Sequence, residues 1–161
     1  MVGIYRQGAV CKRGHVQTRD ISRMPIGDRC PDCGAAVLKS CSRCGHRIRG
    51  DYDVPGVVAI GFSWEPPQFC DKCGAPHPWV NRQGRIYELE NLLDDEELDP
   101  ADELAAREQL HALASEDLDD EEQARRWMRV KRHAPGLFER LGAQRIIETV
   151  AAAAIRQQLG L

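Results

Sequence analysis

The residues of this sequence best suited to chemistry are seven cysteines and one histidine between positions 11 and 73. Six of the cysteines form three Cys-x-x-Cys pairs, and the seventh precedes a histidine by four positions. Thiolates and imidazole nitrogens at such spacings are typical ligands of tetrahedral zinc, and eight ligands suffice for two ions. The candidate ligands are Cys11, His15, Cys30, Cys33, Cys41, Cys44, Cys70 and Cys73.

The order of these ligands predicts sequential pairing. One Cys-x-x-Cys supplies half of a tetrahedral site, so each must pair with another half. Cys33 and Cys41 are too close for a hairpin between them, whereas the spans 15–30 and 44–70 can each hold one. Both sites would then be filled entirely by protein, which indicates structural rather than catalytic zinc. We predict two tandem zinc ribbons, with one ion on Cys11, His15, Cys30 and Cys33 and the other on Cys41, Cys44, Cys70 and Cys73.

Two other interpretations of the cysteines are disulfides and redox thiols. Disulfides require an oxidising compartment, and residues 1–10 lack the apolar run of a signal peptide. A redox Cys-x-x-Cys usually occurs singly, beside a βαβ pattern. His15 is the weakest ligand candidate, with a free surface histidine as the alternative. We expect a cytoplasmic protein.

Further polar residues near the second site suggest two additional activities. His46 lies among Arg43, Arg47 and Arg49, an arrangement that could serve phosphodiester cleavage in a small ribonuclease, with the histidine as base. The same arginines could bind RNA or DNA phosphates. The alternative is a solvent-exposed turn. Aromatic candidates for stacking on bases, which could equally pack against the metal sites, are Tyr52, Phe62, Trp64 and Trp79.

The first half of the chain resembles an uncharacterised bacterial family of double zinc-ribbon proteins, a domain of unknown function. The resemblance supports the fold and the ligands and implies no activity. It rests on the ordered cysteine motifs, on the run Arg-Gly-x-Tyr-x-Val-Pro-Gly-Val and on the closing Cys-Gly-x-Pro-x-Pro-Trp. The matching residues are Cys11, Gly14, His15, Cys30, Cys33, Cys41, Cys44, Arg49, Gly50, Tyr52, Val54, Pro55, Gly56, Val57, Cys70, Cys73, Gly74, Pro76, Pro78 and Trp79.

Composition changes sharply after the last cysteine motif. Residues 1–83 carry 12 Lys and Arg against 7 Asp and Glu, whereas residues 84–161 carry 10 against 18. Cysteine disappears, and apolar residues recur at helical spacing. We therefore divide the chain into a tandem zinc-ribbon module over 1–82 and a helical, oligomerising region over 83–161. The predicted fold class is a small, metal-stabilised α+β protein with short β-hairpins followed by three to four helices.

The helical region shows start signals and a wide apolar stripe. Asp99-Pro100 is typical of a helix start, another start lies within 115–122, and the last helix is expected from about Leu137 to Leu159. Residues 88–122 hold 16 acids and one base, whereas 123–161 hold eight bases and two acids. The two blocks could pair within one chain or between chains. The stripe on the last helix consists of Ile146, Ile147, Val150, Ala151, Ala154 and Ile155.

These features favour a binding protein over an enzyme. The expected function is that of an adaptor that recognises a protein partner and forms a homo-oligomer through its last helix. RNA or DNA binding through Arg43, Arg47 and Arg49 and a ribonuclease with His46 as base remain alternatives. No apolar run reaches the roughly 18 residues that a spanning helix needs, so no membrane is expected.

Overall fold

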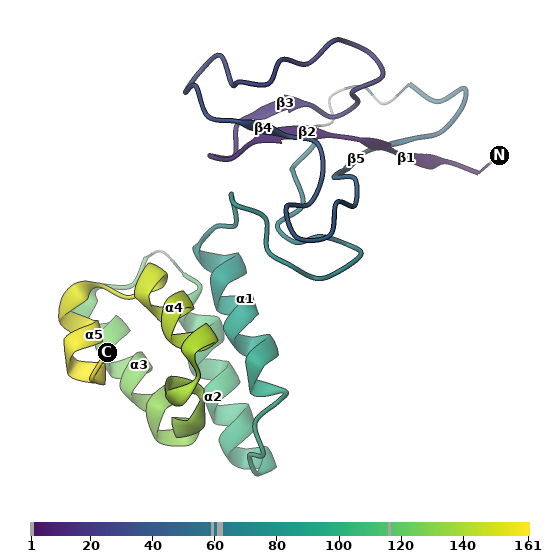
Figure 1. Cartoon of the computed structure of the whole chain (residues 1–161). Helices are drawn as coiled ribbons and strands as arrows, with labels where there is room; N and C mark the ends of the chain where they lie inside the picture. The colour runs from purple at the N-terminus through teal and green to yellow at the C-terminus, as the bar shows by residue number, and fades with distance from the viewer. Residues whose placement is uncertain (1, 59, 61–62, 116) are drawn as a thin grey trace. The chain divides into compact units, whose positions relative to one another are not determined.

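The computed structural model describes residues 2–58, 60, 63–115 and 117–161. The chain divides into two compact units, Met1–Val80 and Asn81–Leu161, here called the zinc-ligand unit and the helical unit. Short antiparallel strands occupy the first unit, and helices make up the second (Figure 1). The first unit also contains two cysteine-rich clusters. This arrangement confirms the predicted α+β fold class.

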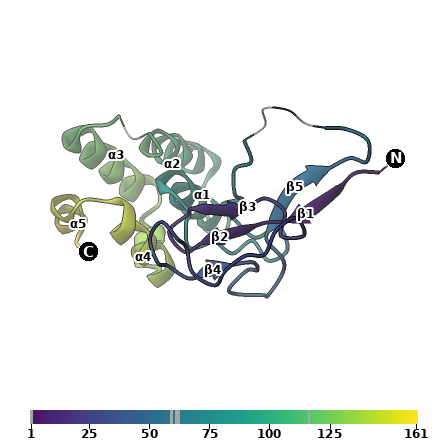
Figure 2. The ribbon, with the colours of Figure 1, turned by 90° about the horizontal axis from the view of Figure 1, so that it is seen from above.

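The zinc-ligand unit contains two small antiparallel sheets (Figure 2). Strands β1 (Ile4–Gln7) and β5 (Arg49–Asp53) form one sheet. In the other, β2 (Ala9–Cys11) lies between β3 (Val16–Thr18) and β4 (Val37–Leu38). All three residues of β2 are fully buried. The central strand therefore ends directly at the first metal ligand, Cys11, and fixes its backbone.

The pairing of β5 differs from the hairpin expected within the span 44–70. Among the described residues of that span only β5 forms a strand, and its partner is β1, with Tyr5 opposite Tyr52. Val57, Val58 and Ile60, which follow β5, lie outside strands, and residue 59 is outside the described ranges. A Cβ atom at Gly50 would lie 2.1 Å from the carbonyl oxygen of Arg19. A glycine is needed there because backbone, not a side chain, approaches β5.

The first ribbon also differs from expectation. The span 15–30 was expected to hold a hairpin, but its strand, β3, ends at Thr18 and pairs with β2. The chain then turns around the buried carboxylate of Asp20, which accepts hydrogen bonds from the backbone N–H and hydroxyl of Ser22, at 3.0 and 2.6 Å. These bonds, with Arg6 nearby, outweigh burial and lower the pKa of Asp20. A turn around a buried carboxylate thus takes the place of a hairpin within this span.

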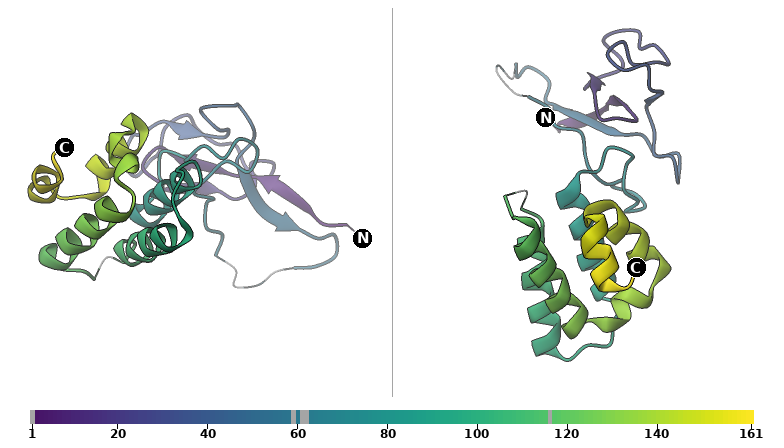
Figure 3. Two further views of the ribbon diagram at one scale, coloured as in Figure 1. Left: turned by 90° about the horizontal axis from the view of Figure 1, so that it is seen from below. Right: turned by 90° about the vertical axis from the view of Figure 1, so that its left-hand side faces the viewer.

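The helical unit consists of five α-helices and one short 3-10 helix among its described residues. They are α1 (Arg82–Leu93), α2 (Pro100–Leu113), α3 (Asp120–His133), the 3-10 helix η1 (Pro135–Glu139), α4 (Leu141–Val150) and α5 (Ala153–Leu159). Figure 3 shows α2 and α3 as adjacent helices, and α3 also packs against α5. None of the described helices has the length and apolar composition needed to cross a membrane.

Helix starts follow the capping signals in the sequence. Asp99 caps α2 by accepting hydrogen bonds from the backbone N–H groups of Ala101 and Asp102, with Pro100 at the first helical position. Asp119 caps α3 in the same way through the N–H of Glu122. Helix α3 begins with three acids and ends with three basic residues, an order that complements its dipole.

One apolar core holds the helical unit together. Most of the stripe expected to mediate oligomerisation belongs to this core, since only Ala154 of its six residues is exposed. The buried stripe is therefore not accessible to a second chain in this conformation. The core residues are Ile86, Leu89, Leu93, Ala106, Leu110, Leu113, Trp127, Val130, Ala134, Leu137, Phe138, Ala143, Ile146, Ile147, Val150, Ala151, Ile155 and Leu159.

The expected last helix is broken into η1, α4 and α5. Ala151 and Ala152 adopt extended conformations, with ψ of 137° and 154°. The carbonyl of Val150, left without a helical partner by this break, accepts a hydrogen bond from the guanidinium of Arg82. Arg82 also donates to the carbonyl of Leu113 and to the side chain of Gln123. It thereby joins α1, the C-terminal ends of α2 and α4, and the first turn of α3.

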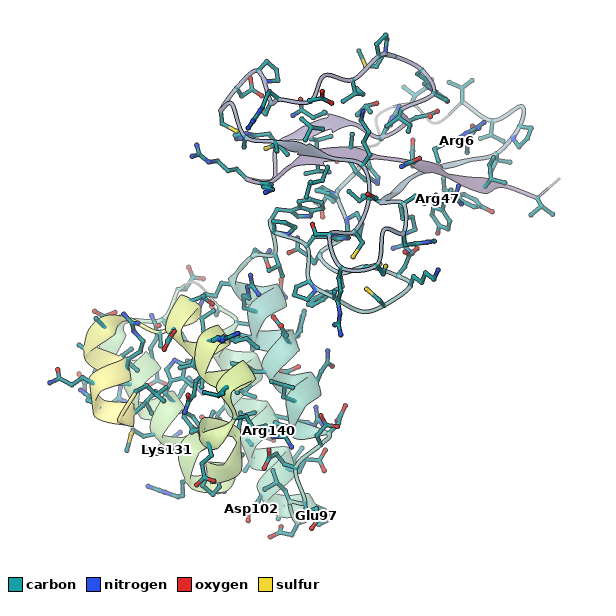
Figure 4. All side chains as sticks on the ribbon, viewed as in Figure 1. Arg6, Arg47, Glu97, Asp102, Lys131 and Arg140 are labelled. Carbon is teal, nitrogen blue, oxygen red and sulfur yellow. The ribbon has the colours of Figure 1, made fainter. Side chains whose placement is uncertain are left out.

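The acidic and basic blocks pair within this unit. Arg140 contacts Asp95 at 3.4 Å and Glu96 at 2.6 Å, and the His133 ring lies 2.7 Å from the Asp102 carboxylate. Figure 4 marks Arg140 and Asp102. Each of these contacts links a residue of the acidic block to one of the basic block. Part of the charge segregation is thus balanced inside a single chain.

Candidate metal centres

Three turns of the zinc-ligand unit repeat one backbone geometry. In each Cys-x-x-Cys-Gly segment, the glycine N–H donates to the carbonyl of the first cysteine, at 2.8 to 2.9 Å. The N–H of the first cysteine donates to the carbonyl of the residue after the glycine, at 2.7 to 2.9 Å. The glycines, at φ of 68° to 72°, are Gly34, Gly45 and Gly74. This left-handed conformation is strained for other residues, and it turns both sulfur atoms toward one point.

The first half-site is a variant of the same turn. The N–H of Cys11 donates to the carbonyl of His15, and Gly14, at φ of 93°, donates to the carbonyl of Cys11. This turn is one residue shorter than the others, and the ligand is its last residue, which brings the imidazole Nδ1 of His15 to 3.6 Å from the sulfur of Cys11. A histidine thus takes the place that a second cysteine has in the other turns.

The structure brings the eight candidate ligands into two groups of four. In the first group, the Nδ1 atom of His15 lies 3.3 Å from Cys33 Sγ and 3.6 Å from Cys30 Sγ, and the sulfurs of Cys11 and Cys33 are 3.8 Å apart. In the second group, Cys41 lies 3.8 Å from Cys73, and Cys44 lies 3.6 Å from Cys70. Within each group all ligand atoms lie within 4.8 Å of one another.

These spacings fit tetrahedral zinc. Metal–sulfur bonds of about 2.3 Å at tetrahedral angles place sulfur atoms about 3.8 Å apart, close to the separations in both groups. A disulfide would need sulfurs at about 2.0 Å, and all seven cysteines are free. The first group, with three cysteines and a histidine, and the second, with four cysteines, are therefore compatible with two structural zinc ions. Both are complete without water, which leaves no open position for catalysis.

The electrostatics of the groups also suit a cation. Burial opposes ionisation of Cys30, but hydrogen bonds from backbone N–H groups of Asp32 and Cys33 lower its pKa to about 6. Backbone N–H groups in the same way overcome burial at Cys41 and lower its pKa to about 7. At Cys44 a backbone N–H favours the thiolate, but burial and three neighbouring sulfurs raise the pKa to about 12. Four thiolates can coexist here only with positive charge between them.

The aromatic residues near the groups mostly pack. Trp79 stacks on the buried ring of His77 at 4.6 Å between centroids, and its indole N–H donates to the carbonyl of Pro67. Desolvation, partly opposed by Asp71, lowers the pKa of His77. Trp64 lies against Gly8, where an added Cβ would come within 2.6 Å of its ring. Phe62, the remaining stacking candidate, lies outside the described residues.

The candidate catalytic histidine and the candidate nucleic-acid-binding arginines do not form one cluster. His46 lies 3.5 Å from Asp71, which belongs to the Cys70–Cys73 turn, so its ring bridges the two turns of the second group. Arg43 lies within the Cys41–Cys44 turn, Arg47 precedes β5, and Arg49 is the first residue of β5, opposite Gln7 of β1. Catalysis by His46 and nucleic-acid binding by the arginines stay predictions, because no contact in the structure decides them.

Tyr5 is a residue whose role the sequence did not reveal. The Arg49 guanidinium lies 5.0 Å from its ring centroid, and the Tyr52 ring lies 4.9 Å away. Arg47 lines one hollow of about 400 Å³ with Tyr5, Ile4 and Arg6. Figure 4 labels Arg6 and Arg47. Two of the three predicted arginines therefore meet at Tyr5, a grouping that depends on the unexpected pairing of β1 with β5.

Comparison with known proteins gives one match. Residues 4–159 match the family described as "Uncharacterized protein conserved in bacteria (DUF2321)". No curated protein and no solved structure matches the chain. The match spans both the metal-ligand groups and nearly all of the helical unit. The chain therefore belongs to this bacterial family of uncharacterised proteins.

Proposed function

We propose that this protein is a zinc-stabilised binding protein that recognises an extended peptide segment of a protein partner. The observation that carries the proposal is a group of exposed apolar side chains on the zinc-ligand unit, which we call the ribbon patch. Their exposed fractions range from 46% at Tyr5 to 84% at Val58. Contiguous exposed apolar surface of this kind marks interaction sites. The ribbon patch consists of Ile4, Tyr5, Tyr52, Val57 and Val58.

Contacts indicate that these residues form connected surface. Tyr5 and Tyr52 are opposite in register and in ring contact. Tyr52, Val57 and Val58 line one hollow of about 190 Å³, and Ile4 and Tyr5 line another. The β1–β5 sheet has two strands. The outer edge of β5 is already met by the segment at Arg19, whose carbonyl accepts a hydrogen bond from the Asp51 N–H at 3.1 Å. The outer edge of β1 over residues 4–6 has no partner strand among the described residues. An extended peptide could add a strand there, with its apolar side chains on the ribbon patch.

The arginines beside the ribbon patch indicate that the bound peptide also carries acidic side chains. The patch is bordered by Arg47 and Arg49, neither of which forms an ion pair with any residue the structure describes. Arg6, by contrast, is paired with Asp53, and Arg19 with Asp51. Two unpaired guanidinium groups beside apolar surface favour a ligand that alternates apolar and acidic side chains.

The test uses a display library of short peptides and the full-length zinc protein. We expect selected peptides to alternate apolar and acidic residues, and Val58→Ser or Tyr52→Ser to weaken their binding about 10-fold or more. Leu104→Ser, at an exposed leucine of the helical unit, is the matched control and should leave binding unchanged. Arg47→Glu should shift the selection toward basic peptides. Binding that survives both patch variants would refute the proposal.

RNA or DNA binding is the second candidate, favoured by the proximity of exposed tyrosine rings to arginines that form no ion pair with a residue the structure describes. Base stacking on Tyr5 or Tyr52, with Arg43, Arg47 and Arg49 on phosphates, would give affinity that falls steeply with salt. A labelled single-stranded oligonucleotide tests this directly. The triple variant Arg43→Glu, Arg47→Glu, Arg49→Glu should abolish binding. An unchanged salt slope in the triple variant would place the site elsewhere.

A further inference from the structure

A hollow of about 600 Å³ is lined by residues of α3 and α5. Its floor includes Ala124 and Met128 of α3 and Ala154 and Ile155 of α5. Met128 is 45% exposed, and Ala154 is exposed as well. An exposed methionine between small side chains is typical of surface that another helix can approach closely.

The α3 wall of this hollow carries an ordered sequence of charges. Asp120, Ala124, Met128 and Arg132 follow one another at four-residue intervals and so lie along one side of the helix. Glu121, Arg125 and Arg129 form the adjacent row. Along both rows the stripe is acidic at the beginning of α3 and basic at its end. We call these seven residues the α3 stripe.

The charges at the two ends of the α3 stripe are largely unused inside the chain. Asp120, Arg129 and Arg132 are exposed, and none of them forms an ion pair with a described residue. Glu121 reaches only Arg125, at 3.3 Å. Lys131, next to the stripe, is used differently, because its ammonium donates to the Leu159 carbonyl and secures α5 beside α3 (Figure 4). The two helices that line the hollow are thus held together by Lys131, whereas Asp120, Arg129 and Arg132 form no ion pair with a described residue.

The geometry points to a second copy of this chain as the occupant, with two α3 helices packed antiparallel about a two-fold axis. Along α3, the pair Asp120 and Arg132 and the pair Ala124 and Met128 are centred on the same position, residue 126, where a two-fold axis can pass. An antiparallel copy therefore places the acidic end of each stripe opposite the basic end of the other. It also places each Met128 opposite the small Ala124. Such self-complementarity is the requirement for an isologous dimer, and a parallel copy would juxtapose like charges.

This surface differs from the one expected from the sequence. The apolar stripe of the last helix is buried in its own core, and only the exposed side of α5 reaches the contact. The α3 stripe is about 18 Å long, so two copies of it would bury less area than a standard interface. We therefore expect a dimer that dissociates in the high-micromolar range, to which both charged ends contribute.

The test is a pair of charge reversals measured by sedimentation equilibrium on the full zinc-loaded chain. Variant one, Asp120→Lys with Glu121→Lys, makes both ends basic. Variant two, Arg129→Glu with Arg132→Glu, makes both ends acidic. Each alone should weaken self-association at least about 10-fold. An equimolar mixture should associate again as a heterodimer, because every end then meets an opposite charge.

Controls separate this contact from misfolding and from other surfaces. Arg145→Glu and Glu148→Lys reverse exposed charges on α4 and should leave the dimer unchanged. Recovery in the mixture shows that both variants are folded. A wild-type chain that is monomeric up to about 1 mM overturns the inference, and so does a mixture that stays monomeric when both variants retain the helical circular dichroism of the wild type.

Discussion

The two units have nearly the same length but are stabilised in different ways. The zinc-ligand unit has eight buried hydrophobic residues among those described, and four of them are cysteines of the metal groups. The helical unit has a core of 18 buried residues and no cysteine in its sequence. A small domain that buries so little apolar surface needs another source of stability. In the zinc-ligand unit the metal groups occupy the place of a core.

The comparison also explains where binding surface is available. In the helical unit most large apolar side chains face the core, and the exposed ones, such as Leu104, Met128 and Leu141, are the exceptions. In the zinc-ligand unit Tyr5, Tyr52, Val57 and Val58 remain exposed, since metal coordination does not require their burial. A fold held by metal can therefore leave its aromatic and aliphatic side chains free for a ligand.

Removal of metal should produce the largest difference between the units. Zinc binding at structural sites contributes about 10–16 kcal/mol per site as folding free energy. We expect excess chelator to collapse the amide resonances of residues 1–80 in a heteronuclear NMR spectrum, while those of 81–161 keep their positions. Elemental analysis should give two zinc ions per chain before chelation.

A single-site variant refines this measurement. Cys70→Ser should reduce the metal content and unfold the segment around the second group, whereas the helical resonances persist. Dispersed resonances from residues 1–80 after complete chelation would contradict the view that metal replaces a core there.

A cavity in the helical core should have an intermediate effect on stability, and this effect should be confined to the helical unit. Leu110, on α2, is fully buried, whereas Leu104 on the same helix is 61% exposed. Leu110→Ala should lower the free energy of unfolding of the helical unit by about 2–5 kcal/mol. Leu104→Ala, the matched control, should change it by less than about 0.5 kcal/mol. Thermal unfolding followed by circular dichroism measures both.

Zinc content should remain unchanged in these two variants. A loss of zinc in Leu110→Ala would show that the stability of the metal groups depends on the helical core, and the distinction between the units would then fail.

Local signals predicted much of this molecule. The α+β class followed from the cysteine motifs and the change in composition, and the start of α2 followed from Asp99-Pro100. Each cysteine pair is followed by a glycine, the residue that best tolerates the left-handed turns that the structure contains there. All of these features depend on residues within a few positions of one another, where steric and hydrogen-bonding preferences act directly.

Features that depend on distant residues were not predictable in this way. The partner of β5 is β1, more than 40 positions earlier, and the close approach needs Gly50 beside Arg19 and Gly8. The last helix breaks within a run of four alanines that favours helix. Arg82, far away in sequence, satisfies the carbonyl at the break, while Ile155 and Leu159 gain burial. Tertiary contacts outweighed local propensity at both places.

The smallest expected effect concerns the N-terminal cap of α2 and acts on the helical unit alone. The backbone N–H of Asp102, which donates to the Asp99 carboxylate, is the main cause of the lowered pKa of Asp99. A carboxyl group with a lowered native pKa stabilises the fold above its unfolded pKa of about 3.9, and this stabilisation is lost as the pH falls through the native value. Asp99→Ala should therefore destabilise the helical unit at neutral pH.

Asp99→Asn separates charge from hydrogen bonding, because an amide can cap the helix but does not titrate in this range. The stability difference between wild type and Asp99→Asn should be present at pH 7 and should vanish at a pH below the native pKa of Asp99. Amide resonances of residues 81–161, followed during thermal unfolding at each pH, report this unit even after acid has released zinc from the other. A difference that stays constant down to pH values well below the unfolded pKa would show that the cap acts through geometry alone, and the helical unit would then owe none of its acid sensitivity to this carboxylate.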